Sequence, residues 1–337
     1  MNYRIFGKSG LRVSELCLGT MTFGSEWGWG ADYEESKRIF DVYAEAGGNF
    51  IDTANRYTEG SSEKMLGEFI ASDRHHFVLA TKYSLYDKMG DPNFSGNHRK
   101  NMLRSVEASL KRLQTDFIDI LYVHAWDSIT PVEEVLMALN QLVMSGKVLY
   151  LAISDTPAWV ISRANTIAEL RGWNAFIGLQ AEYSLLQRTA ERDLIPMAKE
   201  MGLALTPWAP LAGGALTGKY LKGETGRVTE QSARRNEKNT EIVQKVVDWA
   251  AKLNVSPAAL ALKWTMQKDF VSIPVVGARK AAQLQDSIEA LSLQIPEEVL
   301  GELDTVSKID LGFPHEFLAS KDVKQVVFGG TFDAIKH

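Results

Sequence analysis

Residues 118–124 read IDILYVH and residues 148–155 read VLYLAISD, two short apolar runs that each end at a polar side chain. Neither run alternates between apolar and polar residues, which is typical of strands buried on both faces in a parallel sheet. His124 and Asp155 stand at the carboxyl ends of these runs. The two stretches therefore predict neighbouring parallel strands whose polar ends lie at one edge of a sheet.

The same pattern recurs along the chain. Strands are predicted at 15–19, 49–52, 77–81, 117–124, 148–154, 175–180, 203–207 and 271–276. Helical patterns separate them, and this alternation fits an α/β fold of the (β/α)8 TIM-barrel type, with a doubly wound open sheet as the alternative. In a barrel the carboxyl ends of all strands share one face, and barrel enzymes carry their active sites there.

The clearest helical pattern runs from Thr130 to Ser145. Thr130 is predicted as its N-cap, Pro131 as its first helical residue, and Glu133 as the partner in a capping box. Gly146 follows the last turn, and one face collects apolar side chains at helical spacing: Val132, Val135, Leu136, Leu139 and Val143. The same spacing predicts a second helix through Leu103, Val106, Leu110 and Leu113.

Three segments lie outside the repeating pattern. Residues 3–14 predict a short hairpin before the barrel, with Ser9 and Gly10 at its turn. The polar stretch from Lys222 to Asn239 is either a flap over the pocket or a solvated surface loop. The weakly periodic C-terminal extension from Leu311 onward is expected to pack near the pocket mouth. Residues 1–337 are thus predicted to form a single barrel domain.

The composition is ordinary for a globular protein, with 45% apolar and 23% charged residues among 337. The net charge of -5 disfavours nucleic acid or an anionic membrane as a partner. The single cysteine, Cys17, excludes an internal disulfide, and its apolar surroundings predict a buried residue rather than a nucleophile. No segment reads as a secretory leader or membrane span, so a cytoplasmic location is expected. His75 and His76 directly precede a strand and the other histidines are isolated, so no metal site is expected.

Four residues at or just beyond successive strand ends predict a unit for acid–base chemistry. A free phenol has a pKa near ~10 and donates its proton poorly at neutral pH, but a neighbouring ammonium lowers that pKa. Lys82 can supply this ammonium to Tyr57, and Asp52 can hold Lys82 in place. His124 can direct a ring N–H at a carbonyl oxygen. Each residue alone has an ordinary structural role, but their joint occurrence predicts proton transfer and oxyanion stabilisation at one carbonyl or alcohol.

Long motifs in a fixed order link the chain to a known family. They are GTMTFG, FIDTANRYTEGSSEKMLGEFI, LATKY, SLKRLQTDFIDILYVHAWD, GLQAEYSLLQR, TPWAPLAGGALTGKY and PVVGARKAAQLQDSIEAL. Over about residues 3–305 the chain resembles the aldo-keto reductase superfamily, and most of all its aryl-alcohol dehydrogenase-like branch. The resemblance implies NADPH/NADP+ as cofactor, direct hydride transfer without a metal, and a catalytic tetrad of Asp52, Tyr57, Lys82 and His124.

The resemblance also implies which residues bind the nicotinamide. Trp208 offers a flat face for stacking. Ser154, Asp155 and Gln180 stand where they can hydrogen-bond the carboxamide. The family usually has Asn where this chain has Asp155, and an ionised aspartate accepts hydrogen bonds without donating them. Further cofactor residues follow from the resemblance: Thr20, Met21, Asp52, Ala209, Pro210 and Leu211.

The rest of the cofactor is expected to lie along glycine-rich and cationic segments. In the stretch 210–220, Gly213 and Lys219 suit a pyrophosphate, whereas Tyr220 stands where a triphosphate loop needs Ser or Thr. Arg279 is a natural partner for a 2′-phosphate, which favours NADPH over NADH. The adenosine end of the family is matched by Gly277, Gln283, Asp286 and Ser287, the last in place of a frequent Asn. The polar insertion adds cations that either close over the phosphates or stay solvated: Arg227, Arg234 and Arg235.

Aromatic residues near the strand ends indicate the kind of substrate. They suit a flat, apolar aldehyde or ketone: Trp27, Trp29, Tyr86 and Trp126. The predicted activity is NADPH-dependent reduction of such carbonyls to alcohols, and the reverse, with Tyr57 as the proton donor. An NADPH-binding regulatory barrel related to the potassium-channel β-subunits is the alternative, and a phosphate-handling barrel isomerase is a third.

Overall fold

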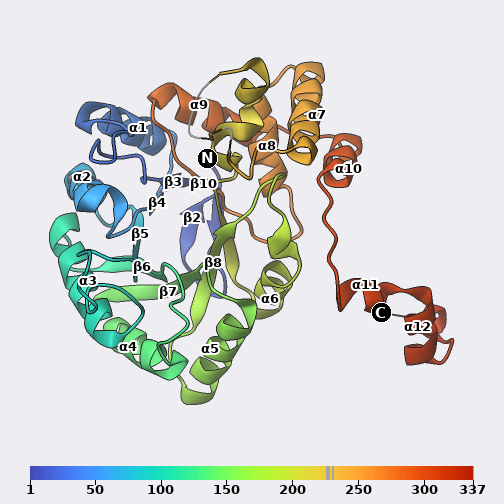
Figure 1. Cartoon of the computed structure of the whole chain (residues 1–337). Helices are drawn as coiled ribbons and strands as arrows, with labels where there is room; N and C mark the ends of the chain where they lie inside the picture. Colours follow the sequence, from blue (N-terminus) through green and yellow to red (C-terminus); the bar gives the residue numbers. More distant parts are fainter. Residues whose placement is uncertain (225–227, 230, 337) are drawn as a thin grey trace.

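Eight parallel strands form the centre of the computed structural model, which describes residues 1–224, 228–229 and 231–336 (Figure 1). The strands are β3 (Cys17–Gly19), β4 (Phe50–Asp52), β5 (Val78–Tyr83), β6 (Ile118–Val123), β7 (Val148–Ser154), β8 (Phe176–Glu182), β9 (Ala204–Trp208) and β10 (Val275–Val276). They pair in the order β10-β3-β4-β5-β6-β7-β8-β9, so neighbours in the sheet are neighbours in the sequence. The predicted strands are confirmed, although the last one is shorter than expected.

Backbone hydrogen bonds between β9 and the segment before β10 close the ring. The N–H of Leu205 donates to the carbonyl of Val271 (2.9 Å), and the N–H of Ile273 donates to the carbonyl of Leu205 (2.9 Å). Leu205 and Ser272 thereby form a parallel bridge. The predicted TIM barrel is confirmed and the doubly wound sheet is wrong, because that fold has two free edges and a reversal in its strand order.

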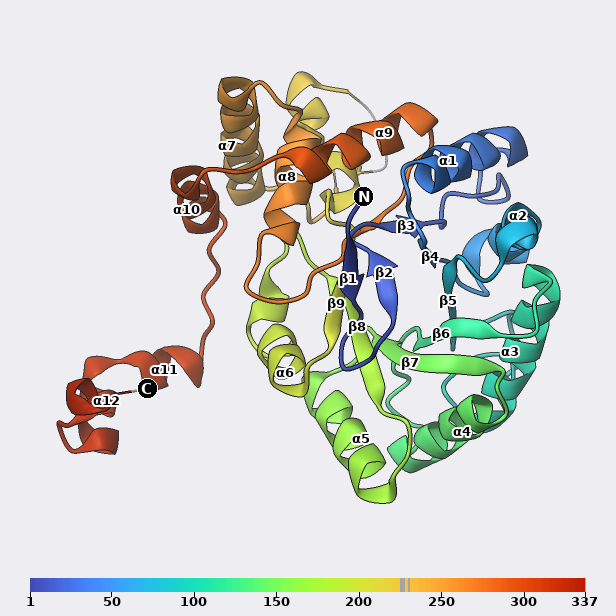
Figure 2. The same cartoon turned by 180° about the vertical axis from the view of Figure 1, so that it is seen from behind.

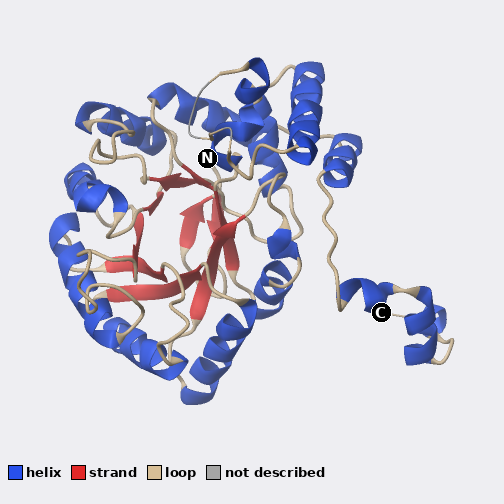
Figure 3. Cartoon of the chain, viewed as in Figure 1, coloured by secondary structure: helices blue, strands red, loops and turns tan. Residues whose placement is uncertain are grey.

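Helices surround the strands, as the blue and red elements of Figure 3 show. They are α1 (Tyr33–Glu45), α2 (Ser61–Phe69), α3 (Arg99–Leu113), α4 (Val132–Met144), α5 (Ala158–Arg171), α6 (Leu194–Met201), α7 (Glu237–Leu253), α8 (Pro257–Met266), α9 (Ala281–Glu289) and α10 (Glu297–Val306). Alternate residues of a strand serve the two sides of the barrel wall. In β6, Leu121 and Val123 pack against the helices, whereas Ile120 and Tyr122 lie in the interior cluster. Within the described chain, no helix has both the length and the apolar character needed to cross a membrane.

The two predicted helices correspond to α3 and α4, but α4 begins differently from its prediction. The helix starts at Val132, Pro131 occupies the N-cap position, and Glu133 forms an ion pair with an arginine of α5. Asp127 in the preceding loop accepts hydrogen bonds from the N–H (2.8 Å) and hydroxyl (2.7 Å) of Thr130. The predicted Thr130 cap and capping box are therefore wrong, because a loop carboxylate satisfies these groups. The apolar face of α4 is confirmed.

The predicted hairpin, β1 (Tyr3–Ile5) with β2 (Arg12–Ser14), lies across one end of the barrel in Figure 2. Phe6 follows β1 and is fully buried, with its ring 5.5 Å from that of Phe50 between centroids. Gly178 of β8 makes room for it, because a Cβ there would lie 2.5 Å from the Phe6 ring. Cys17 is buried in the same cluster, as predicted. The hairpin thus closes the N-terminal end of the barrel and leaves the carboxyl ends of the strands open.

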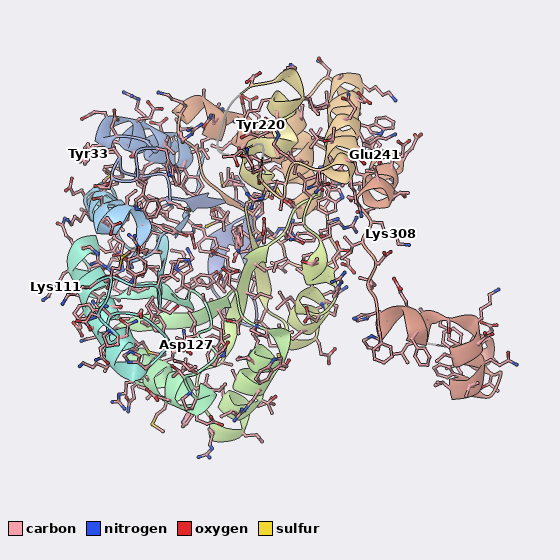
Figure 4. The ribbon with its side chains drawn as sticks, viewed as in Figure 1. Tyr33, Lys111, Asp127, Tyr220, Glu241 and Lys308 are labelled. Atoms are coloured by element: carbon pink, nitrogen blue, oxygen red, sulfur yellow. The ribbon has the colours of Figure 1, made fainter. Side chains whose placement is uncertain are left out.

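The polar insertion lies between β9 and α7, and Tyr220 marks this region in Figure 4. The Tyr220 hydroxyl accepts a hydrogen bond from the N–H of Val228 (2.9 Å). The predicted loop ends earlier than expected, because α7 already begins at Glu237 with Asn236 as its N-cap. Arg227 lies outside the described residues.

The chain leaves the barrel after α10, near Lys308, which is labelled in Figure 4. The Lys308 carbonyl accepts a hydrogen bond from Lys238 Nζ (2.9 Å), and the Asp310 carbonyl accepts one from Arg192 (2.9 Å). Beyond this point α11 (His315–Ala319) and α12 (Lys321–Phe328) stand apart from the barrel (Figures 1 and 2). None of the residues described from 311 to 336 is buried. The expectation of a tail packed near the pocket mouth is therefore wrong.

Candidate active site

Three neighbouring strands and one tight turn bring the four predicted catalytic residues together. Asp52 is the last residue of β4, Lys82 is next to last in β5, and His124 directly follows β6. Tyr57 begins a short turn, Tyr57–Gly60, in which Thr58 has a φ of 46°. The Thr58 hydroxyl donates to a backbone carbonyl of the loop after β3 (2.6 Å), which fixes this turn against the barrel.

Lys82 is the centre of the cluster. Its Nζ donates to Asp52 Oδ2 (2.5 Å), to the Thr53 carbonyl (2.9 Å) and to Tyr57 Oη (3.1 Å). Lys82 is 0% and Asp52 2% exposed, and buried charges of this kind are tolerated only as a hydrogen-bonded pair. Gln180 Nε2 completes the pair by donating to Asp52 Oδ1 (2.9 Å). The hydrogen bonds therefore form a chain that leads from the barrel interior to the phenol oxygen.

The buried surroundings decide the protonation of this cluster. Burial alone would lower the pKa of Lys82, but Asp52 and Tyr57 outweigh it and the net shift is upward. Burial raises the pKa of Tyr57, the charge and hydrogen bond of Lys82 lower it, and the net shift is again upward. The expectation that the ammonium lowers the pKa of Tyr57 overall is therefore wrong. Lys82 acts in the expected direction, but the desolvation of a phenolate is the larger effect.

His124 lies beside Tyr57, with the two rings edge to face at 6.0 Å between centroids. Burial lowers the pKa of His124 well below its usual value, and the charge of Lys82 lowers it further. The imidazole is therefore neutral at neutral pH, with one nitrogen as donor and the other as acceptor. Its Nδ1 is buried without a hydrogen-bond partner among the described residues, so the ring retains polar capacity for a bound molecule.

Three of the four residues open directly onto a cavity of about 860 Å³, and Lys82 lies behind its wall. Trp27 and Trp29 also line this cavity. Predicted site residues distant in the sequence meet along its walls: Met21, Asp52, Tyr57, His124, Ser154, Asp155, Gln180, Trp208, Ala209, Pro210, Leu211, Gly213, Lys219, Gly277, Arg279, Gln283, Asp286 and Ser287.

Three other predicted residues do not line the cavity. Thr20 is buried behind the wall, where its hydroxyl donates to the Asp52 carbonyl (3.0 Å). Tyr86 contacts the cavity only through Arg56, which lies over its ring at 4.4 Å and donates to its hydroxyl (2.8 Å). Trp126 packs against the apolar core outside the barrel. Direct contacts of these three with cofactor or substrate are therefore not supported.

Trp208 and Asp155 are joined at the wall of the cavity. Trp208 Nε1 donates to Asp155 Oδ1 (3.1 Å), a contact that the sequence did not indicate. Partial burial raises the pKa of Asp155, and the hydrogen bond from Trp208 opposes this shift. One amide N–H of Gln180 holds Asp52, and the residue lines the cavity, so its contact with the carboxamide stays a prediction. Ser154 is almost fully buried and presents only a small part of its surface.

Glycines and cations form the next part of the wall. Gly213 and Gly214 have φ values of 67° and 89°, a conformation that side chains rarely adopt. A Cβ on Gly213 would lie 3.0 Å from Arg234 Nη1, and one on Gly214 would lie 3.4 Å from Lys219 Nζ. Arg234 is held there by Glu182 of β8 (2.5 Å), so it is part of the cavity rather than of a solvated run. Two cations beside a bare backbone suit a pyrophosphate.

The remaining wall is formed by the start of α9. The Arg279 N–H donates to Gln283 Oε1 (2.9 Å), and the Arg279 side chain is exposed. Asp286 and Ser287 continue this wall one turn further along the helix. A polar tetrad, a glycine cradle with cations, and a further arginine thus follow one another along a single cavity. This donor set fits a nicotinamide dinucleotide from ring to adenosine.

Several wall residues were given no role in the sequence analysis, although most lie within the quoted motifs: Gly19, Thr22, Arg56, Leu85, Gly214, Thr217, Ala258, Val275 and Val276. Arg56 is the most polar of them, and its guanidinium lies over the Trp27 ring at 5.6 Å. Its position directly before Tyr57 in the sequence could have indicated that Arg56 lies at the cavity. The apolar and glycine residues gave no such indication, because their contribution is backbone shape rather than side-chain chemistry.

The fold and the site together define a barrel oxidoreductase that acts on a carbonyl or alcohol group with a nicotinamide cofactor. The chain belongs to the aldo/keto reductase family, whose model matches residues 15–308. The family resemblance drawn from the motifs is therefore confirmed.

Relatives with similar sequences carry names from the same chemistry. The chain is 41% identical over 327 residues to a norsolorinic acid reductase of Aspergillus flavus, covering 94% of this chain and 84% of the relative. It is 40% identical over 347 residues to an aryl-alcohol dehydrogenase of Pestalotiopsis microspora, covering 96% and 88%. It is 38% identical over 331 residues to an aryl-alcohol dehydrogenase [NADP(+)] of Phanerodontia chrysosporium, covering 91% and 86%.

Proposed function

We propose that this protein uses NADPH to reduce aldehydes or ketones to alcohols, and catalyses the reverse oxidation, with Tyr57 as the proton donor. The observation that carries the proposal is the hydrogen-bond chain from Asp52 through Lys82 to Tyr57, which ends at the cavity that His124 also lines. Among common side-chain arrangements, this one is suited to a substrate oxygen that must receive a proton while its carbon is reduced.

Each tetrad residue has a distinct task in this proposal. NADPH, when bound, supplies the hydride that the carbonyl carbon accepts. Tyr57 keeps its proton at neutral pH and transfers it to the substrate oxygen as negative charge develops there. Lys82 stabilises the phenolate that remains, and Asp52 keeps Lys82 charged and in place. The neutral imidazole of His124 directs an N–H at the same oxygen.

The cofactor preference is proposed from the cations of the cavity. Arg279 lines the cavity just before α9, and a guanidinium forms strong paired hydrogen bonds with a 2′-phosphate. Arg234 and Lys219 are suited to the pyrophosphate, and Trp208 to stacking on the nicotinamide. The name of the Phanerodontia chrysosporium relative includes NADP(+), which supports the same choice.

The substrate class is proposed from the aromatic side of the cavity. Trp27 meets Tyr57 edge to face, with 6.5 Å between ring centroids. The rings of Trp27 and Trp29 lie 5.8 Å apart and are tilted by 41°. A flat aromatic carbonyl compound fits beside these rings. The name of the Pestalotiopsis microspora relative, aryl-alcohol dehydrogenase, agrees with an aromatic substrate.

The decisive experiment is a panel of aromatic and aliphatic aldehydes and ketones, followed by NADPH absorbance and repeated with NADH. We expect turnover with NADPH and aromatic aldehydes. Tyr57→Phe is expected to lower kcat by about 10²–10⁴-fold, because it removes the acid and keeps the ring. Tyr33→Phe is the matched control, since that exposed hydroxyl on α1 bonds only Glu68 among the contacts observed and lies on the outer surface (Figure 4).

The panel also separates the proposal from a regulatory role. A barrel that only binds NADPH would show cofactor affinity without turnover on any member of the panel. Full activity of the Tyr57→Phe variant would refute Tyr57 as the proton donor. The cofactor assignment would be unaffected, because cofactor binding tests it separately.

A further inference from the structure

Asp155 is a charged group in the part of the cavity where the chemistry takes place. It directly follows β7 and has a φ of 39°, a backbone conformation that Asp and Asn adopt more readily than other side chains. Its carboxylate accepts the hydrogen bond from Trp208 Nε1 (3.1 Å), and the indole that donates is neutral. Glu182, the next carboxylate along this edge, is instead neutralised by Arg234 (2.5 Å). Asp155 therefore carries an unpaired negative charge into the cavity, as judged from the ion pairs of the described residues.

The charge of Asp155 reaches the reacting centre. Burial is the main cause of the raised pKa of Tyr57, and the negative charge of Asp155 adds to it. A nicotinamide that exchanges a hydride with the carbon bound to the oxygen at Tyr57 must lie next to that residue, in the section of cavity that Asp155 and Trp208 line. The side chain of Asp155 is accessible from the open cavity, so a bound ring would exclude water from it and strengthen its electrostatic effect.

The two redox forms of the cofactor differ in charge at this position. The oxidised nicotinamide ring is a cation, whereas the reduced ring is neutral, and the carboxamide is the same in both. A hydrogen bond to the carboxamide therefore stabilises both forms alike, but a nearby carboxylate stabilises only the oxidised ring.

We propose that Asp155, oriented by Trp208, is the residue that sets the relative affinity of this protein for oxidised and reduced NADP in favour of the oxidised form. By linkage, this preference shifts the equilibrium on the protein toward alcohol and oxidised cofactor, which is the direction of carbonyl reduction. The inference rests on the function proposed above, because it requires the nicotinamide to bind beside Tyr57.

The experiment compares dissociation constants rather than activity. NADP+ and NADPH are titrated separately into the purified full chain, and binding is followed by quenching of its tryptophan fluorescence, for which the chain has eight tryptophans. Asp155→Asn removes the charge, keeps an oxygen that can accept from Trp208, and suits the positive φ. We expect this variant to weaken NADP+ binding about tenfold more than NADPH binding, which corresponds to about 1.4 kcal/mol.

Asp286→Asn is the matched control. It removes one negative charge from the same cavity, but on α9, the element that the proposed function assigns to the adenosine end of the cofactor. We expect it to change both dissociation constants by the same factor, because the two redox forms are identical at their adenosine ends. An Asp155→Asn variant that changes both constants equally would overturn the inference and leave the proposed function intact. Failure of the unmodified protein to bind either nucleotide would overturn the proposed function itself.

Discussion

At the N-terminal end of the barrel, Phe6 and Val13 of the hairpin region pack with Phe50 in a buried apolar cluster. At the carboxyl end, an ammonium and a carboxylate are equally buried, with Lys82 0% and Asp52 2% exposed, and Lys82 donates to the phenol that faces the cavity. Apolar burial stabilises the fold in proportion to the area removed from water, whereas the burial of a charged pair has a large desolvation cost that its attraction only offsets. The N-terminal end of the barrel therefore contributes to the free energy of unfolding. The buried charges at the carboxyl end lower that free energy but provide the groups suited to catalysis.

The largest effect that tests this comparison is expected at Lys82. Lys82→Met leaves Asp52 buried with a charge and with Gln180 as its remaining side-chain partner. We expect the free energy of unfolding to fall by about 3–5 kcal/mol, as for other broken buried pairs. Urea denaturation followed by circular dichroism measures the change.

The double variant Asp52→Asn with Lys82→Met separates the lost pair from the lost packing. Because it contains no unpaired charge, we expect it to be more stable than Lys82→Met alone. Equal stability of the two variants would show that the buried carboxylate carries no penalty, and the contrast between the two ends of the barrel would then fail.

An effect of intermediate size is expected at the apolar end. Gly178→Ala places a Cβ 2.5 Å from the ring of Phe6, and the tightly packed cluster has no room for it. We expect a loss of about 1–3 kcal/mol in the free energy of unfolding with kcat unchanged, because the clash lies at the end opposite the cavity. In a Phe6→Leu background the same substitution should cost less. An equal cost there would mean that Phe6 is not the group that excludes a side chain.

The contrast between the two ends of the barrel also explains which features could be predicted from the sequence. The barrel was predictable because its strands are continuous apolar runs. The meeting of Asp52, Lys82 and His124 was predictable because they stand at the ends of such runs. Individual contacts between residues far apart in the sequence were not predictable. An example is the hydrogen bond between Gln180 and Asp52, which are separated by 128 residues. The direction of the Tyr57 pKa shift was also not predicted. The sequence indicates the charged neighbour of the phenol, but the desolvation of the phenol depends on how the folded chain packs around it.

A smaller effect is expected from pH at His124. Its pKa is lowered in the folded protein, whereas an unfolded histidine takes up a proton near pH 6.5. Below that pH the unfolded state binds the extra proton, so the free energy of unfolding falls by up to about 1.4 kcal/mol for each pH unit. The effect fades above about pH 7.5, where the histidine is almost entirely neutral in both states.

The variant His124→Gln isolates this contribution from the other histidines. Denaturation is measured for both proteins at pH 7.5, 6.5 and 5.5. As the pH falls, we expect the free energy of unfolding to decrease more in the unmodified protein than in the variant. A parallel decline of the two proteins would indicate that His124 becomes protonated in the folded state and has no part in the acid sensitivity.

The smallest effect is expected from the segment beyond the barrel. A variant that ends at Leu311 removes α11 and α12, which pack on each other and stand apart from the barrel in Figures 1 and 2. We expect the free energy of unfolding to change by less than about 0.5 kcal/mol and kcat to stay the same, because none of the described residues lost is buried. The control ends at Pro296 and also removes α10, whose Val299 and Leu303 are buried in the main core. That control should lose several-fold more stability, and a tail deletion that destabilises the protein as much would show that the tail packs on the barrel after all.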